Sequence, residues 1–286
     1  MAAEAAHSIV DVGSGGLMLY GYGRSRRGPD TRHPLGYGRE LYFWSFVVAL
    51  LFFTLGAGFS ILEGVRRMID PADIRSPIVI YIVLAAEALF DGVSWVVALK
   101  AFRAAKGDLS YWQAVKSSKD PPSFIVLAED TAGLVGIAVA IAGTYMATSF
   151  NFPVADGIAS ALVGLVLATV GWVLVRESKG LLIGEQAESE LSQSILALSE
   201  NQDGVEGANG VITTHLAPDQ IVVALSLEFS DELRTPEIEK AVLSLEARVR
   251  EKHPEVVALF VKPQSSALFE KAMRATGRDA AFARNA

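Results

Sequence analysis

Three ionisable residues near the start of the sequence lie in an apolar segment and have types and spacings that suit metal binding. Glu4, His7 and Asp11 are three and four positions apart, which places them on one face of a helix. An imidazole nitrogen and a carboxylate oxygen one turn apart can share one divalent ion, and zinc accepts both ligand types. On a soluble helix this pair would be a surface contact, but inside a membrane an ionisable residue is a functional candidate.

A second acidic pair, Glu129 and Asp130, stands near the start of another apolar block. Consecutive helical residues point about 100° apart, so only one of them faces a given site squarely. Asp130 completes a site with His7 and Asp11 if the two helices pack together. Glu129 is either a further ligand or an interfacial or structural acid.

Two more carboxylates, Glu87 and Asp91, are four positions apart in a third apolar block. Two interpretations of the role of this pair stay open. One is a role in binding metal or protons, and the other is a structural polar contact between helices beside Gly92.

Four residues outside the apolar blocks also carry metal-binding side chains. Asp30 and His33 either bind metal at the membrane surface or belong to a turn fixed by Pro34 and glycines, with His33 capping it. His215 and His253 fall at the ends of elements in the last third of the chain. They are either ligands or, as is commoner, solvated surface histidines.

Long apolar blocks must position these side chains. The chain has 286 residues, is 51% hydrophobic and has a mean hydropathy of +0.35. Each block is near the ~20 residues that a helix needs to cross a bilayer. We therefore predict an all-α transmembrane bundle with five spans, from the blocks Ala2–Tyr22, Leu41–Val65, Pro77–Phe102, Phe124–Phe150 and Ala155–Val175.

Composition excludes several classes of protein. Cysteine is absent, which rules out disulfides, thiolate zinc sites and thiol catalysis. The net charge is −7, with the acidic excess after the last apolar block, and this argues against a nucleic-acid partner. A His-Glu-x-x-His metalloprotease motif is also absent, and we expect no enzyme and no organic cofactor.

Charged loops predict the orientation in the membrane. Basic residues gather in three loops that lie on one side if every span crosses once, and that side is cytoplasmic by the positive-inside rule. These residues are Arg24, Arg26, Arg27, Arg32, Arg39, Arg103, Lys106, Lys116, Lys119, Arg176 and Lys179. Met1–Asp11 shows no cleavable signal peptide, and a protein of the bacterial inner membrane needs none because its first span can target it. With the basic loops on the inner side, we expect a bacterial inner-membrane protein whose C-terminal domain is cytoplasmic.

After Gly184 the pattern becomes that of a small α+β domain with the order α-β-β-α-β, similar to a ferredoxin-like fold. The predicted elements are Ala187–Ser199, Gly210–His215, Ile221–Glu228, Thr235–Lys252 with Thr235 as N-cap, and Val256–Val261. The expected domains are a transmembrane domain over residues 1–184, a small cytoplasmic domain over 185–264, to which the family resemblance given below adds a role in dimerisation, and a flexible tail over 265–286.

Several of these runs together resemble the cation diffusion facilitator family. The run Ala3–Asp11 resembles its second transmembrane helix, and the loop from Asp30 to Glu40 is similar to the stretch that follows. Four further runs resemble the branch of the family that contains the zinc transporter 9 group: Ser118-Lys-Asp-Pro121, Glu129-Asp130, Asp156-Gly-Ile-Ala-Ser160 and Gly180-Leu-Leu-Ile-Gly-Glu185. The resemblance implies a homodimer that exchanges Zn²⁺ or a related ion for protons, with a site at His7, Asp11 and Asp130.

The sequence departs from the family pattern at three places. Val126 stands four positions before Asp130, where many members have His or Asp, so one of four ligands is missing and water, Glu129 or Glu4 would fill the gap. Tyr37 stands where some members have another His of a second site at Asp30 and His33. Nothing precedes the match to the second helix, so five of six expected spans are present and we expect poor transport by this chain as it stands.

The resemblance implies a mechanism and leaves rivals open. Asp11 and Asp130 would offset the charge of the ion, and His7 would carry the exchanged proton because imidazole titrates near neutral pH. Zn²⁺ is favoured, and Mn²⁺, Fe²⁺ and Co²⁺ remain open. The alternatives are a non-transporting metal-binding membrane regulator and an inactive truncated transporter.

Overall fold

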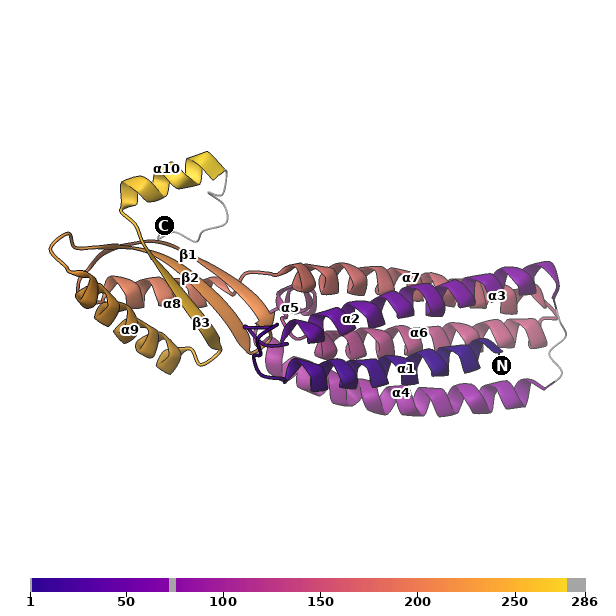
Figure 1. Cartoon of the computed structure of the whole chain (residues 1–286). Coiled ribbons are helices and arrows are strands. Elements are labelled where there is room, and N and C mark those ends of the chain that lie inside the picture. Colours follow the sequence, from indigo (N-terminus) through magenta and orange to yellow (C-terminus); the bar gives the residue numbers. More distant parts are fainter. Residues whose placement is uncertain (1, 72–75, 277–286) are drawn as a thin grey trace. The chain divides into compact units, whose positions relative to one another are not determined.

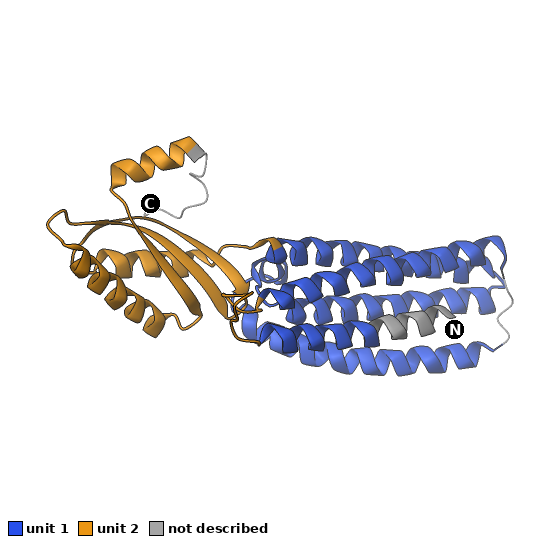
Figure 2. Ribbon diagram, in the orientation of Figure 1, with its two compact units in different colours: residues 1–26, 39–182 blue, residues 27–38, 183–286 orange. Residues whose placement is uncertain are grey.

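The computed structural model describes residues 2–71 and 76–276, with side chains for residues 12–71 and 76–275. It divides into two compact units (Figure 2). The membrane unit comprises residues 1–26 and 39–182, and the C-terminal unit comprises residues 27–38 and 183–286.

Long helices build the membrane unit, side by side along one direction (Figure 1). Proline begins two of them, α4 and α6, at the position where its missing N–H costs nothing. The elements are α1 Ala2–Ser25, α2 Arg39–Leu51, the π-helical turn η1 Phe52–Ala57, α3 Gly58–Ile69, α4 Pro77–Lys106, α5 Tyr111–Ser117, α6 Pro121–Ser149 and α7 Val154–Ile183.

Within the described residues, four helical segments are long and apolar enough to cross a membrane: Arg39–Ile69, Pro77–Lys106, Pro121–Ser149 and Val154–Ile183. The first of them runs without interruption through α2, η1 and α3. Large apolar side chains point outward from these helices, as Ile78 and Phe90 do on α4 with 73% and 74% of their surface exposed. Such a surface suits lipid and not water. The predicted first span falls in α1, and its crossing of the membrane stays a prediction.

Apolar clusters and close glycine contacts are two of the features that hold the membrane unit together. At the end where α6 begins, Tyr42, Phe124, Ile125 and Leu174 form a buried apolar cluster. Farther along, α3 and α7 approach so closely that only glycine fits between them. A Cβ added at Gly64 would lie 2.5 Å from the backbone nitrogen of Ala161. Such small-residue contacts substitute for the hydrophobic effect, which does not drive helices together in lipid.

The C-terminal unit is a three-stranded sheet with helices. β1 pairs antiparallel with β2, and β2 pairs parallel with β3, in the order β1-β2-β3. A parallel neighbour requires a crossover, which α9 supplies. The bounds are α8 Ser189–Glu200, β1 Val205–Ala217, β2 Gln220–Phe229, α9 Thr235–Lys252, β3 Val256–Pro263 and α10 Ser266–Thr276. The predicted fold, a transmembrane helical bundle followed by an α-β-β-α-β domain, is confirmed.

Three local details differ from the sequence predictions. Both strands of the hairpin are longer than predicted, because their pairing continues through irregular positions near Gly207 and Gly210. The N-cap of α9 is Arg234 and not Thr235, and its backbone N–H donates to the Glu237 carboxylate at 2.7 Å. In the segment expected to be a flexible tail, residues 266–276 form α10, which buries Phe269 and Met273.

Candidate metal-transport site

Asp130 lies on α6, whose buried residues include Phe124, Ile125 and Ala132. Oδ2 of Asp130 and Oε1 of its neighbour Glu129 are both buried. Burying a carboxylate oxygen in a membrane-spanning helix is costly, so the position is a functional candidate. Val126, one turn earlier on the same helix, offers no ligand atom to this site.

The other predicted ligands of this site, His7 and Asp11, and the accessory candidate Glu4 lie on α1. Their side chains fall outside the described residues, so the joining of these residues to Asp130 remains a prediction. The described part of α1 packs on α2, where Gly21 lies against the side chain of Trp44. Among the side chains that the structure describes, no three of His, Asp or Glu gather as metal ligands would.

A hydrogen bond fixes the register of α4 against α6. The indole Nε1 of Trp95 donates to the hydroxyl oxygen of Thr131 at 2.9 Å. Thr131 is the residue that follows Asp130 on α6. The two helices run in opposite directions, so positions before Trp95 on α4 lie beside positions after Thr131 on α6. Asp91 and Glu87 are therefore one and two turns from the level of Asp130, toward the end of the bundle that carries Ser149.

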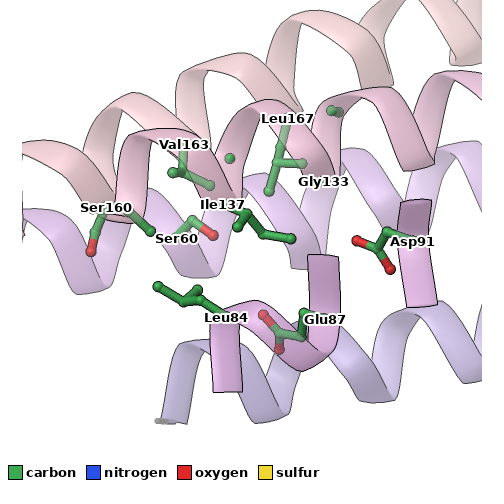
Figure 3. A pocket seen from close by; sticks show the side chains of 12 residues that line it. Ser60, Leu84, Glu87, Asp91, Gly133, Ile137, Ser160, Val163 and Leu167 are labelled. Atoms are coloured by element: carbon green, nitrogen blue, oxygen red, sulfur yellow. The ribbon is translucent and has the colours of Figure 1, made fainter. Parts of the chain in front are cut away.

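Both of these carboxylates line a cavity of about 90 Å³ between α3, α4, α6 and α7 (Figure 3). Its other polar residues are Ser60 and Ser160, which sequence reasoning missed. A single serine in an apolar helix gives no signal of its own, because its hydroxyl commonly bonds to its own helix. Because Glu87 and Asp91 line this cavity and also have contacts within the bundle, a role in binding metal or protons and a structural contact both stay predictions.

Charged residues that sequence reasoning did not assign also join α3 to α7. Arg67 Nη1 donates to Asp156 Oδ2 at 2.6 Å, and Arg67 Nε donates to Glu63 Oε1 at 3.0 Å. Glu63 and Arg67 are four positions apart in an apolar block, which was the available signal. The group lies at the Ser149 end of the bundle, where α3 ends and α7 begins.

The loop carrying Asp30 and His33 has the geometry of a closed turn. The Asp30 carboxylate accepts from the backbone N–H groups of Arg32 and His33 at 2.8 and 2.7 Å, and from the Tyr37 hydroxyl at 2.7 Å. It is therefore Asp30, and not His33, that caps the turn. The Tyr37 hydroxyl, followed by the two backbone N–H groups, lowers the pKa of Asp30 from 3.8 to about 2.

The two remaining histidines are not solvated surface residues. His215 is 4% exposed, and its Nδ1 lies 3.1 Å from the carbonyl oxygen of Ala217. His253 Nε2 lies 2.8 Å from the hydroxyl of Ser194 on α8, and its Nδ1 lies 3.4 Å from a Glu255 oxygen. Each imidazole is thus engaged in holding the C-terminal unit together.

A bundle of apolar helices with carboxylate oxygens buried in two of its residues is the arrangement of an integral membrane protein with functional candidates inside its spans. The model of the cation efflux transmembrane domain matches residues 1–183. The chain belongs to the cation efflux family, whose members are transporters and not enzymes.

Curated relatives narrow the branch. Metal tolerance protein C4 of Arabidopsis thaliana is 28% identical over 233 residues, which cover 81% of this chain and 51% of the relative. The human mitochondrial proton-coupled zinc antiporter SLC30A9 is 29% identical over 238 residues, 82% of this chain and 42% of the relative. The magnetosome protein MamB of Paramagnetospirillum magneticum is 24% identical over 269 residues, 93% of this chain and 86% of the relative.

The resemblance to the zinc transporter 9 branch of the family is therefore confirmed. The chain spans about half the length of the first two of these relatives.

Proposed function

We propose that this protein moves Zn²⁺ out of the cytoplasm in exchange for protons, with Asp130, His7 and Asp11 as the shared ligands of metal and proton. The observation that carries the proposal is the buried carboxylate of Asp130 in a membrane-spanning helix of a cation efflux chain. Binding of Zn²⁺ there requires deprotonated ligands, so metal and proton compete for the same atoms and exchange follows.

Zinc is the proposed ion because an imidazole joined to carboxylates suits it, and because the SLC30A9 relatives are named proton-coupled zinc antiporters. Mn²⁺, Fe²⁺ and Co²⁺ also accept carboxylate oxygens, so they are the competitors to include in an assay. With Val126 beside Asp130, the fourth ligand in this proposal is water, Glu129 or Glu4.

The proposal includes a homodimer in a bacterial inner membrane, with the C-terminal unit in the cytoplasm. The supporting pattern is the set of basic residues in three loops on one side. Of the two opposite loops, Asn151–Val154 carries no charge, and the other is a partial exception with Arg66, Arg67 and Arg75. Chemical cross-linking in membranes, followed by mass measurement, tests the dimer. Protease access to the C-terminal unit in sealed inverted vesicles tests the orientation.

The transport experiment uses purified protein in vesicles that contain a fluorescent zinc indicator, with an imposed pH gradient. We expect zinc entry that depends on the pH gradient. In Asp130→Asn the rate of zinc entry should be at least about tenfold lower, because the charge that offsets desolvation of the ion is removed. Asp108→Asn, which removes a carboxylate from the exposed loop after α4, is the matched control and should retain the rate.

Two results would contradict the proposal. Undiminished zinc flux in Asp130→Asn would remove Asp130 from the site. Zinc binding without flux in the unchanged protein would favour the alternatives, a metal-binding regulator or an inactive transporter.

A further inference from the structure

The carboxylates of α4 border a space that is large and polar enough to hold water. The cavity of about 90 Å³ is lined by Glu87 and Asp91 from α4, by Ser60 from α3, and by Ser160 from α7. A single water requires roughly 10–15 Å³ of such volume together with polar partners, so the cavity has room for several. Apolar cavities of this size stay dry, whereas four polar side chains favour hydration.

The position of this cavity relative to Asp130 follows from the helix register. Gly133, one turn after Asp130 on α6, contributes to its wall, and Ile137 and Ala140 continue the wall along the same helix. Because Trp95 is bonded to Thr131, Asp91 lies about 6 Å and Glu87 about 12 Å from that level along α4. The cavity thus extends from the neighbourhood of Asp130 toward the Ser149 end of the bundle.

Its floor and walls explain why it is not filled. Gly133 and Gly136 present no side chains on the α6 side, and Val163 and Leu167 close the α7 side (Figure 3). A Cβ added at Gly136 would lie 3.2 Å from a methyl of Val163, so even a methyl group would narrow the passage there. Figure 3 shows the carboxyl groups of Glu87 and Asp91 on the side of α4 that faces this space.

We propose that this cavity is a hydrated passage between Asp130 and the Ser149 end of the bundle, and that Glu87 and Asp91 hold the divalent cation in transit and pass protons in the opposite direction. This inference rests on the proposed function and adds to it a second pair of ion-binding carboxylates on α4. Two carboxylates about 6 Å apart along one helix face, in a hydrated space that also holds two serine hydroxyls, would bind a divalent cation that keeps its water shell. Weak binding suits a passage, because the ion must leave as readily as it enters.

The first arm of the test asks whether the passage is wet. The protein has no cysteine, so single cysteines can be introduced without background. Ala140→Cys places a thiol in the wall of the cavity, whereas Leu89→Cys places one on the lipid-facing side of α4, where Leu89 is 66% exposed. A thiol reacts with a charged methanethiosulfonate reagent only as thiolate, which requires water.

In membrane fragments open to both sides, we expect Ala140→Cys to be labelled at least about tenfold faster than Leu89→Cys, since thiolate forms only in the wet site. Equal and slow labelling of the two variants would show a dry cavity and overturn the proposal.

The second arm measures zinc flux in vesicles for Glu87→Gln and Asp91→Asn, with Asp108→Asn as the control for loss of a carboxylate outside the cavity. Each amide is nearly the same size as the acid, so packing is preserved. One charge a few ångströms from an ion in a partly desolvated space alters ion occupancy by about tenfold or more, and we expect flux to fall by that factor. The equilibrium zinc affinity of the Asp130 site should stay within about twofold, because its own ligands are unchanged and the weak α4 pair does not contribute to it.

The outcomes separate this inference from the proposed function. Normal flux in both α4 variants, with flux lost in Asp130→Asn, would overturn the passage and leave the transport site standing. Normal flux in Asp130→Asn would overturn the proposed function itself. Lost flux with lost equilibrium binding in the α4 variants would place Glu87 and Asp91 in the main site, and would overturn their assignment to a separate passage.

Discussion

Arg67 on α3 and Asp156 on α7 form an ion pair with an N–O distance of 2.6 Å, and their side chains are only 26% and 20% exposed. Glu63 joins the same guanidinium at 3.0 Å, so one cation offsets two carboxylates. Removing one member of such a pair leaves the other charge partly buried and uncompensated, which costs more than the pair itself contributes.

Arg67→Met is therefore expected to destabilise the membrane unit by about 1–3 kcal/mol, since both partners retain some exposure. Thermal unfolding in detergent, followed by fluorescence, measures the change. Arg66→Met is the matched control, because the Arg66 side chain is 82% exposed and lies 3.9 Å from Glu63. A melting temperature equal to that of the control would show that the ion pair does not stabilise the helix contact.

The glycine contact between α3 and α7 gives a second prediction. A Cβ at Gly64 would lie 2.5 Å from the backbone nitrogen of Ala161 and 2.8 Å from the Gly157 carbonyl oxygen, and neither backbone atom can move aside alone. Gly64→Val should therefore separate the helices and lower the melting temperature by several degrees, as overpacking costs about 1–3 kcal/mol. Gly16→Ala, where a Cβ meets nothing within 4 Å, should be neutral or stabilising. Equal melting temperatures for the two variants would contradict the close approach.

The Asp30 turn predicts a pH dependence. The folded-state pKa of Asp30 is about 2 and its ordinary value is 3.8, so the folded loop favours the ionised carboxylate. Stability from this group is present above the ordinary value and is lost as pH falls through the folded value. We expect the turn to loosen between about pH 4 and pH 2, observed as a carboxyl carbon titration by nuclear magnetic resonance.

Tyr37→Phe tests the cause of that shift, because the Tyr37 hydroxyl is its largest source. The variant should raise the pKa of Asp30 toward 3.8, whereas Tyr22→Phe, outside the turn, should leave the titration unchanged. An unshifted midpoint in Tyr37→Phe would assign the low pKa of Asp30 to the backbone N–H groups and the charge of His33.

The hydrophobic pattern of the sequence predicts most of the helices and strands but few of the contacts that build the candidate site. Helices near Pro77 and Pro121 and the alternation of Val223, Leu225 and Leu227 in β2 follow from local periodicity, which a sequence displays directly. The bond from Trp95 to Thr131 and the pair of Arg67 with Asp156 join residues 36 and 89 positions apart. Such pairings depend on helix register, which periodicity does not specify.

Helix α10 gives a fourth prediction and shows the same limit. The sequence predicts a flexible tail here, because the segment shows no strand pattern and its helical pattern is short. In the structure Phe269 and Met273, four positions apart and so on one face of the helix, are 3% and 7% exposed. Phe269→Ala should cost about 3–5 kcal/mol in the attachment of α10, the range for truncating a buried aromatic ring. Limited proteolysis should then cut within residues 266–276 much faster, and Leu268→Ala, at a side chain 58% exposed, should not change the rate. Equal cutting of the two variants would show that α10 is held by other contacts.

The neighbours Glu129 and Asp130 give the prediction that bears most directly on the transport site. Each has a buried carboxylate oxygen, yet side chains of consecutive helical residues diverge by about 100°, so the two carboxylates face different surroundings. If Asp130 is the ligand, Asp130→Asn should weaken zinc binding by about tenfold or more, whereas Glu129→Gln should change it by less than about threefold.

Isothermal titration of the purified protein with Zn²⁺ at fixed pH, repeated in two buffers of different ionisation enthalpy, gives the affinity and the number of protons released. Loss of proton release in Asp130→Asn, but not in Glu129→Gln, would assign the shared proton to the Asp130 site. Equal weakening in the two variants would instead make Glu129 a ligand and would supply the oxygen that Val126 does not.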